Sequence, residues 1–411
     1  MTMEQPHTFI IGAGIIGLTQ AWILSLAGDR VTVVDREEPG RGASFGNAGH
    51  FATEQVFPLA DPALLPQVPA MLMDPLGPFR IRGGYCLKAL PWLMRFVANM
   101  TPARRRHNQA AITALNRRAM EDWQGVLAEC GQSQWLQQQG SLLVYEQTAI
   151  AEQQRQARTF AEAGVICDWL DAAQLHQLEP GLSSTLSGAL WFPETGHTLD
   201  PYGVCRGLMQ TLLQRGVRFE RGQVTAVTPE AAITLADGRQ FQADRLVVAA
   251  GAWSAALAAQ LGYRVPLEAE RGYHLMLTQH SGLRRPVSSA ERKFIITPMA
   301  AGTRLAGTVE FAGRDAPMNP RRADILLHQG KALLPQLNVR QGQGERWMGC
   351  RPSLPDSLPV IGGCHHRRCF FSFGHQHLGL TQAATSARLL GQLMAGQATD
   401  LDLSPYAIHR F

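Results

Sequence analysis

The chain has 411 residues, of which 45% are hydrophobic and 17% are charged, and its formal net charge is +5. These values are typical of a globular protein of two domains or lobes and exclude an intrinsically disordered chain. The mild basic excess favours an acidic substrate or an anionic membrane surface, and no basic motif with interleaved aromatic residues indicates nucleic-acid binding.

The N-terminal residues predict a βαβ unit, in which a strand, a glycine turn and a helix are followed by a second strand. The turn is GAGIIG at residues 12–17, and the second strand ends at Asp35. Gly12 permits the tight turn, Gly14 lets a pyrophosphate approach the backbone, and Gly17 lets the helix pack closely on the strand. The free amides of the helix N-terminus favour phosphate, and the Asp35 carboxylate can accept a hydrogen bond from a ribose 2′-OH. The motif predicts a dinucleotide site, without choosing between NAD and FAD.

A loop of Gly, Ser and Asn residues follows at 36–50. Its small residues allow a ligand close to the backbone, and Ser44 and Asn47 can donate hydrogen bonds to phosphate oxygens. An ordinary surface loop is the alternative. Residues 55–85 are rich in Pro and Gly, which predicts either a functional loop or a covering segment.

A helical region is predicted from residue 87 to residue 129, with a break at Thr101-Pro102. Its first part is apolar and is followed by three arginines at 104–106. A stretch of this kind can rest on an anionic membrane. The alternative is a core-facing helix with a solvated basic end.

The rest of the chain alternates between predicted strands and helices. Asp200 is a candidate N-cap with Pro201 at the first helical position, and Asp237-Gly238 predicts a hairpin turn. Strands are expected at 140–145, 187–192, 217–220, 224–227, 245–251, 273–277, 293–296, 304–307 and 369–373, and helices at 149–163, 171–179, 200–215, 320–337 and from 381 onward.

Five stretches, taken together, point to a known family. They are GAGIIG with VVD at 33–35, GASFGNAGH at 42–50, LVVAAGAWS at 246–254, GCRPSLPDSLPVIG at 349–362 and GHQHLGLTQAATSARL at 374–389. In these stretches the sequence resembles the D-amino-acid oxidase superfamily of FAD enzymes, and most of all its bacterial D-amino-acid dehydrogenases.

The resemblance implies an α/β fold of two lobes, each built from separate parts of the chain. A Rossmann-like FAD-binding domain is expected at 1–52, 193–264 and 346–411. A substrate domain, an antiparallel sheet with helices, is expected at 53–192 and 265–345.

The resemblance also implies non-covalent FAD, held by the N-terminal motif, the following loop, the 224 and 250–253 segments and the 374–381 loop. Negative charge that develops on the flavin would be stabilised by the helix that begins near Leu380. The residues expected to bind FAD are Gly12, Gly14, Ile15, Ile16, Gly17, Asp35, Arg36, Ala43, Ser44, Asn47, Ala48, Gly49, Val224, Ala250, Gly251, Trp253, Gly374, His377, Leu378, Gly379, Leu380 and Thr381.

Four residues are expected at the substrate. The resemblance pairs Arg351, in a Gly-Cys-Arg-Pro motif, with a substrate carboxylate, which a guanidinium fork fits bidentately; the alternative is a structural pair with an acid such as Asp356. Tyr273 lies where family members often carry a substrate-facing aromatic residue, although a strand residue can be merely packed. His50 would lie near the flavin face. His375 would act through its backbone or reach the substrate.

The reaction implied is oxidation of a D-amino acid by hydride transfer from Cα to flavin N5, giving an imine and then a 2-oxo acid and ammonia. The alternatives are a D-proline or cis-4-hydroxy-D-proline dehydrogenase, a glycine or sarcosine-type oxidase, and a non-catalytic flavoprotein subunit. A quinone or an electron-transfer partner is the expected acceptor, with membrane contact through residues 87–106.

The expected location is the cytoplasm, with a peripheral position on the inner face of the cell membrane as a further option. Seven scattered cysteines without a CxxC motif suit a reducing compartment. Glu4 and the absence of a basic segment before the apolar run argue against a signal peptide. The glycines within residues 8–26 favour a βα unit over a membrane span. No metal is expected, because the Cys364–Cys369 segment reads as an exposed turn.

Overall fold

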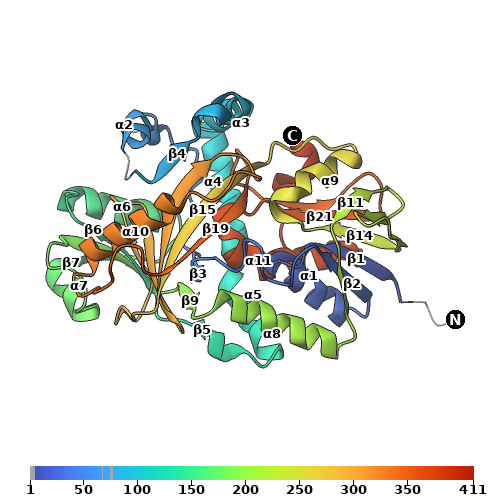
Figure 1. Cartoon of the computed structure of the whole chain (residues 1–411), viewed down its shortest axis with the longest axis horizontal. Coiled ribbons are helices and arrows are strands. Elements are labelled where there is room, and N and C mark those ends of the chain that lie inside the picture. Colours follow the sequence, from blue (N-terminus) through green and yellow to red (C-terminus); the bar gives the residue numbers. More distant parts are fainter. Residues whose placement is uncertain (1–4, 67, 75–76) are drawn as a thin grey trace.

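The computed structural model describes residues 5–66, 68–74 and 77–411. Glu4, used above in the argument on targeting, lies outside the described residues, as do three positions of the 55–85 segment. Figure 1 shows two halves side by side, with α2 and α3 standing out at one edge.

The first half contains a buried sheet whose described strands run in the order β10-β2-β1-β14-β21-β20. All neighbours are parallel except β20 and β21. The central strands are apolar on both faces because both faces are covered. Helices α1, α8 and α11 pack on one face, and the β11–β13 meander with α9 packs on the other. The predicted strands are confirmed as β1 (His7–Ile11), β2 (Arg30–Asp35), β10 (Arg218–Arg221), β14 (Arg245–Val248) and β21 (Cys369–Phe373), with β20 (Val360–Gly363) added.

Helices pack on this sheet and on one another. The helix after the glycine turn, α1, packs against α11 and α8, and small residues of α11 (Ala383, Ala384 and Ala387) are fully buried there. Asp200 occupies the N-cap position of α8 and a proline follows in the first turn, which confirms the prediction, although the Asp200 side chain makes no capping hydrogen bond. The helices are α1 (Ile15–Leu26), α4 (Pro102–Asn116), α5 (Ala119–Glu129), α8 (Pro201–Gln214), α9 (Ser254–Gln260) and α11 (Gly379–Met394).

The second half is a large, mainly antiparallel sheet, in which the described strands run β19-β15-β18-β17-β16-β6-β8-β7, with β4 paired to β18. Its longest strands, β15 and β18, extend well beyond the predicted segments. The strands are β4 (Phe79–Ile81), β6 (Ser141–Tyr145), β7 (Asp168–Asp171), β8 (Gly188–Phe192), β15 (Glu268–Leu277), β16 (Val287–Ser289), β17 (Ile295–Met299), β18 (Gly302–Phe311) and β19 (Glu345–Ser353), and the helices nearby are α6 (Ile150–Glu162), α7 (Ala172–Leu178) and α10 (Pro320–Leu333).

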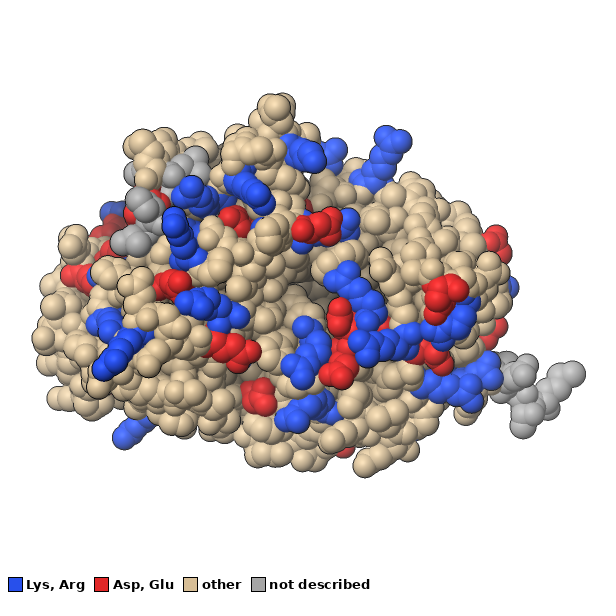
Figure 2. All heavy atoms as spheres, viewed as in Figure 1, with Lys and Arg blue, Asp and Glu red and all other residues tan. Residues whose placement is uncertain are grey.

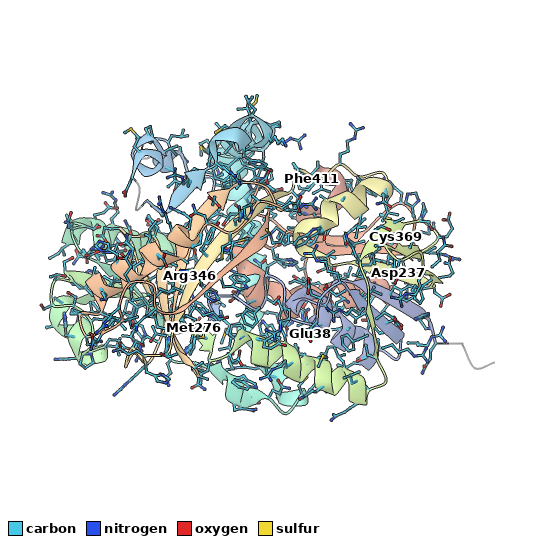
Figure 3. All side chains as sticks on the ribbon, viewed as in Figure 1. Glu38, Asp237, Met276, Arg346, Cys369 and Phe411 are labelled. Atoms are coloured by element: carbon cyan, nitrogen blue, oxygen red, sulfur yellow. The ribbon has the colours of Figure 1, made fainter. Side chains whose placement is uncertain are left out.

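Two small sheets complete the described part of the chain. One joins β3 (His50–Phe51), β9 (Gly196–Thr198) and β5 (Leu136–Gln137), and the other is a meander of β11 (Val224–Val227), β12 (Ala232–Leu235) and β13 (Gln240–Gln242). The predicted Asp237-Gly238 turn joins β12 to β13. Figure 3 places Asp237 and Cys369 in the parallel-sheet half, and Met276 and Arg346 in the other.

The Pro/Gly-rich segment forms a raised edge over the antiparallel sheet. It contains α2 (Val68–Met73) and β4 and leads into α3 (Cys86–Ala98). Within the described ranges, no helix is both long and apolar enough to cross a bilayer.

The two sheets follow the two predicted lobes in outline, and the exact boundaries stay a prediction. One strand differs in its placement. Residues 346–353, assigned above to the FAD lobe, lie in β19, which pairs along its whole length with β15 of the antiparallel sheet. Arg351 is therefore carried by the sheet of the second half.

Candidate active site

A cavity of about 1740 Å³ lies between the two halves and is lined by residues of both. It exceeds the roughly 300–1,000 Å³ of pockets that hold drug-sized ligands. Its walls include Gly12 and Ala250 from the parallel-sheet half, and Tyr273 and Arg351 from the antiparallel sheet. A cofactor and a substrate can therefore share it.

At one end of the cavity, the glycine turn has the geometry that a pyrophosphate needs. Gly12 has a φ of +111°, and a Cβ built there would lie 2.3 Å from the Ala249 carbonyl oxygen. The N-cap residue of α1 is Gly14, which makes no side-chain capping hydrogen bond. The Ile15 amide donates to Ser44 Oγ (2.9 Å), which leaves the Ser44 hydroxyl hydrogen free for a phosphate oxygen.

Acidic and aromatic side chains line the same end. Asp35 Oδ2 accepts the Ala13 amide (2.7 Å) and Oδ1 accepts the Glu37 amide (3.0 Å). The carboxylate is thus held at the end of β2, where a ribose hydroxyl can reach its remaining lone pairs. The Arg36 guanidinium lies 3.7 Å from the centroid of the Trp253 ring, a cation–π contact that closes this end.

The 374–380 loop forms the opposite wall and leads into α11. Gly374 and Gln376 have positive φ angles, +86° and +50°, and no side chain caps α11. The backbone can therefore present amides to a group that becomes negatively charged. The His375 ring hydrogen-bonds Ser386 Oγ (2.9 Å), so His375 ties the loop to the helix, and burial lowers the pKa of its imidazole to about 3.

The two walls together fit FAD. Its pyrophosphate would lie at the glycine turn and its flavin ring at the 374–380 loop. The nearby thiol of Cys350 is buried, which raises its pKa, and a protonated thiol is a poor nucleophile for a covalent link. Non-covalent FAD stays the expectation.

Most predicted site residues line this cavity, and four do not. A Cβ on Gly17 would lie 1.8 Å from the Gly12 carbonyl oxygen, so Gly17 serves helix packing. The Gly49 carbonyl accepts the Thr198 amide, Leu378 is in the hydrophobic core, and Thr381 Oγ1 accepts the Ala52 amide (2.9 Å). The lining residues are Gly12, Gly14, Ile15, Ile16, Asp35, Arg36, Ala43, Ser44, Asn47, Ala48, His50, Val224, Ala250, Gly251, Trp253, Tyr273, Arg351, Gly374, His375, His377, Gly379 and Leu380.

Arg351 lies in the cavity wall with a partner that the sequence reasoning missed. Its Nη1 donates to Glu270 Oε1 (3.0 Å), and its side chain is 27% exposed. Asp356, the alternative partner, instead accepts from Arg410 (2.8 Å). Glu270 also lines the cavity. Alternation along the strand places Glu268, Glu270 and Gly272 on one face, and this signal could have identified Glu270.

Tyr273 contributes its ring to the cavity, but its hydroxyl is bound elsewhere. The hydroxyl donates to Glu310 Oε2 (2.5 Å), and Glu310 also pairs with the buried Arg271 (3.2 Å). Burial, with the carboxylate beside it, raises the pKa of Tyr273 to about 12. The phenol therefore stays protonated at neutral pH.

His50 faces a second buried acid. Its Nε2 lies 3.6 Å from Glu54 Oε2, and neither atom has a hydrogen-bond partner within the described residues. Burial lowers the pKa of His50 to about 4 and raises that of Glu54 to about 7. Near neutral pH the imidazole is therefore uncharged.

One cavity joins a Rossmann-type turn and the 374–380 loop to an accessible guanidinium on a separate sheet. This arrangement is typical of a two-lobed, dinucleotide-dependent oxidoreductase. A family model described as "FAD dependent oxidoreductase" (DAO) matches residues 7–393. The chain therefore belongs to the DAO family and is an FAD-dependent enzyme.

Its relatives are similar over their whole length. A D-amino-acid oxidase of Bradyrhizobium diazoefficiens is 34% identical over 99% of both chains. A D-amino acid dehydrogenase of Vibrio vulnificus is 29% identical over 97% of this chain and 99% of the relative. Among solved structures, glycine oxidase from Geobacillus kaustophilus superposes with a TM-score of 0.74 at 22% identity, covering 99% of this chain and 100% of the other. The L-proline dehydrogenase of P. horikoshii reaches 0.75 at 18% identity, covering 99% and 98%.

Proposed function

We propose that the chain oxidises a D-amino acid, with hydride leaving Cα for flavin N5, to an imine that hydrolyses to a 2-oxo acid and ammonia. The FAD supplies the hydride acceptor. The observation that carries the proposal is the accessible guanidinium of Arg351 in the cavity wall. The names of two full-length relatives, both of which act on D-amino acids, support it.

Arg351 would bind and orient the substrate carboxylate. Nη1 donates to Glu270, and among the described residues the other guanidinium N–H groups have no hydrogen-bond partner, so they can bind a ligand. Charged hydrogen bonds of this kind contribute about 1.5–3 kcal/mol each, and a carboxylate held by two of them has a fixed orientation.

The test replaces Arg351 with Met, which keeps an unbranched apolar stem and removes the guanidinium group and its charge. Loss of two charged hydrogen bonds predicts a fall in kcat/KM by about 10²–10⁴, with FAD content unchanged. The Arg346→Met variant is the matched control. Arg346 lies on the same strand but pairs with Asp324 and does not line the cavity. Retained affinity for amino acids in Arg351→Met would contradict the role.

The substrate itself requires a panel of D- and L-amino acids that includes proline and the 4-hydroxyproline isomers. Glycine oxidase and L-proline dehydrogenase share the fold, so glycine, sarcosine and cyclic imino acids belong in the same panel. Turnover only of L-amino acids or of glycine would replace the D-amino-acid proposal.

We propose a quinone as electron acceptor, because the cavity continues into an apolar compartment. Leu93, Phe96, Val97 and Met100, on and just after α3, line the same cavity as Arg351. Faster turnover with a quinone analogue than with oxygen supports a dehydrogenase, and rapid peroxide formation in air would reverse this choice.

The outer face of α3 supports membrane contact. Leu87, Leu90 and Met94 follow one another at helical spacing and are 84%, 48% and 65% exposed, whereas Ala89 and Trp92 face inward. Figure 2 shows basic side chains around this raised edge. Arg105 is paired with Asp61 (3.0 Å), so its charge is partly compensated. An apolar stripe flanked by cations suits an anionic bilayer.

A further inference from the structure

The substrate end of the cavity holds two opposite charges side by side. Glu270 on β15 and Arg351 on β19 are direct partners in the antiparallel register, and both line the cavity. Directly opposed residues have Cβ atoms about 4.5–5.5 Å apart. An anion site and a cation site therefore lie within the span of one small molecule.

Glu270 is only partly used by this pair. Its Oε1 accepts from Arg351 Nη1 (3.0 Å), and its side chain is 9% exposed. Within the described residues, no hydrogen bond to Glu270 Oε2 is present, although a buried carboxylate is costly unless its oxygens are satisfied. The Glu270 carboxylate thus keeps acceptor capacity at the cavity wall.

The neighbouring acid, Glu310, is not available to a ligand. Its carboxylate accepts a hydrogen bond from Tyr273 and pairs with Arg271, and it does not line the cavity. The pKa of His377 is lowered to about 4, first by burial and then by Arg351, with Glu270 acting in the opposite direction. Strand β19, which carries Arg351, packs against residues 376–378, so the pair of Glu270 and Arg351 lies close to the 374–380 loop.

Charge balance indicates which ligand this pair favours. A simple carboxylate bound to Arg351 would leave Glu270 beside a second negative charge. A zwitterion brings one charge of each sign on a single carbon atom, so its carboxylate can face Arg351 while its ammonium faces Glu270. The net charge of the site is then unchanged.

We infer that Glu270 is the group that recognises the substrate amine, and that it selects α-amino acids over 2-hydroxy acids and plain carboxylates. The inference rests on the proposed function and names a residue role within it. The carboxyl end of the ligand remains with Arg351.

The test compares two ligands of nearly equal shape in the FAD-loaded enzyme. 2-Aminoisobutyrate has no Cα hydrogen and cannot be oxidised, and pivalate carries a methyl group in place of its amine. Binding is measured by calorimetry and by the change in flavin absorbance. In Glu270→Gln, we expect 2-aminoisobutyrate to bind about 10–100-fold more weakly, as for loss of one charged hydrogen bond. Pivalate should bind as well or more tightly, since a repelling charge is gone.

Two further variants distinguish recognition of the amine by Glu270 from a general structural effect of removing a charge. Glu270→Asp keeps the charge and should restore part of the preference for the amine. Glu268→Gln removes the same charge two residues earlier, where the carboxylate bonds the Tyr85 hydroxyl (2.9 Å) outside the cavity lining, and should leave the preference unchanged. Equal weakening of both ligands in Glu270→Gln would overturn the inference.

The outcome is distinguishable from failure of the proposed function. Turnover of D-amino acids with an unchanged ligand preference in Glu270→Gln would overturn the role of Glu270 alone. Absence of turnover with every amino acid would overturn the proposed function, and the two binding constants would still decide the role of Glu270.

Discussion

Arg351 keeps its orientation partly because the residue beside it has no side chain. A Cβ on Gly272 would lie 2.6 Å from the guanidinium carbon of Arg351. The obstacle is the far end of a flexible side chain rather than backbone. The position of the guanidinium, more than the fold, therefore depends on this glycine.

Gly272→Ala should accordingly impair activity without unfolding the protein. We expect kcat/KM to fall about 10–100-fold, equivalent to one charged hydrogen bond, with a melting temperature within a few degrees of wild type. Gly125→Ala is the control, because a Cβ there meets nothing within 4 Å. A variant with normal kcat/KM would show that the guanidinium relaxes without loss.

Site residues within a contiguous motif were predictable from the sequence, whereas contacts that depend on the register between two strands were not. The Gly-Cys-Arg-Pro motif is contiguous, so Arg351 was predictable from its neighbours in sequence. Glu270 lies 81 residues away, and its approach to Arg351 depends on how β15 pairs with β19, which a single sequence does not specify. The hydrogen bond from the Tyr273 hydroxyl to Glu310 of β18 was unpredictable for the same reason, because it depends on how β15 pairs with β18.

At the scale of elements, the glycine turn packs backbone against backbone. A Cβ on Gly17 would lie 1.8 Å from the Gly12 carbonyl oxygen, and neither atom belongs to a side chain that can turn away. Helix α1 can lie against β1 only while this position is glycine.

Gly17→Ala should therefore weaken the fold and the cofactor site together. Overpacking of this kind costs about 1–3 kcal/mol or more, so the purified variant should contain less FAD and melt at a lower temperature. Gly125→Ala, in the interior of α5, should instead stabilise the protein by about 0.5–1 kcal/mol. Equal FAD content in Gly17→Ala and wild type would contradict the packing argument.

The exposed apolar side chains on the outer face of α3 lead to a second prediction at this scale. Changing Leu87, Leu90 and Met94 to Ser should reduce binding to vesicles that contain anionic lipid by at least tenfold, because each buried apolar side chain contributes about 1.5–3 kcal/mol. Leu213→Ser, at an exposed position of α8, should leave binding unchanged. Sedimentation with vesicles gives the measurement, and a wild-type protein that stays in the supernatant would remove the membrane proposal.

Elements with a clear apolar pattern were predicted well, and charged strands were not. The N-terminal strands and α1 follow the expected pattern. β15 begins at Glu268 rather than at 273, since Glu270 and Arg271 resemble exposed loop residues although both are buried in ion pairs. β18 is buried on both faces along most of its length, so it lacks the alternation that marks a strand.

Across the whole molecule, buried neutral histidines make stability depend on pH. Burial lowers the imidazole pKa to about 3 for His274 and His375, and to about 4 for His50, His197 and His377. Between these values and 6.5 the unfolded chain binds more protons than the folded chain, so stability falls as pH falls.

The melting temperature should therefore drop by at least about 5 °C between pH 7.5 and pH 5.5. Glu54, with a pKa raised to about 7, acts in the opposite direction between 4.5 and 7, but the imidazoles outnumber it. His274→Phe keeps the ring that stacks on Trp347 and should reduce the drop. A melting temperature that is constant over this range would contradict the neutral state of these residues.

The two-lobed division was accessible from motifs scattered over the whole chain, but the assignment of β19 was not. The sequence of β19 contains the Gly-Cys-Arg-Pro motif, which was assigned to the FAD lobe, but the strand belongs to the antiparallel sheet. Only strand pairing shows that Arg351 belongs to the antiparallel sheet, whereas the glycine turn and the 374–380 loop belong to the parallel-sheet half.

The charge pair at the substrate end also bears on how the product leaves. A 2-oxo acid keeps the carboxylate of the amino acid and has lost its ammonium, so Glu270 faces an anion with nothing to neutralise it. The same carboxylate that attracts the substrate then repels the product. Turnover should consequently proceed with little inhibition by accumulated 2-oxo acid, because the carboxylate of Glu270 weakens the binding of the product.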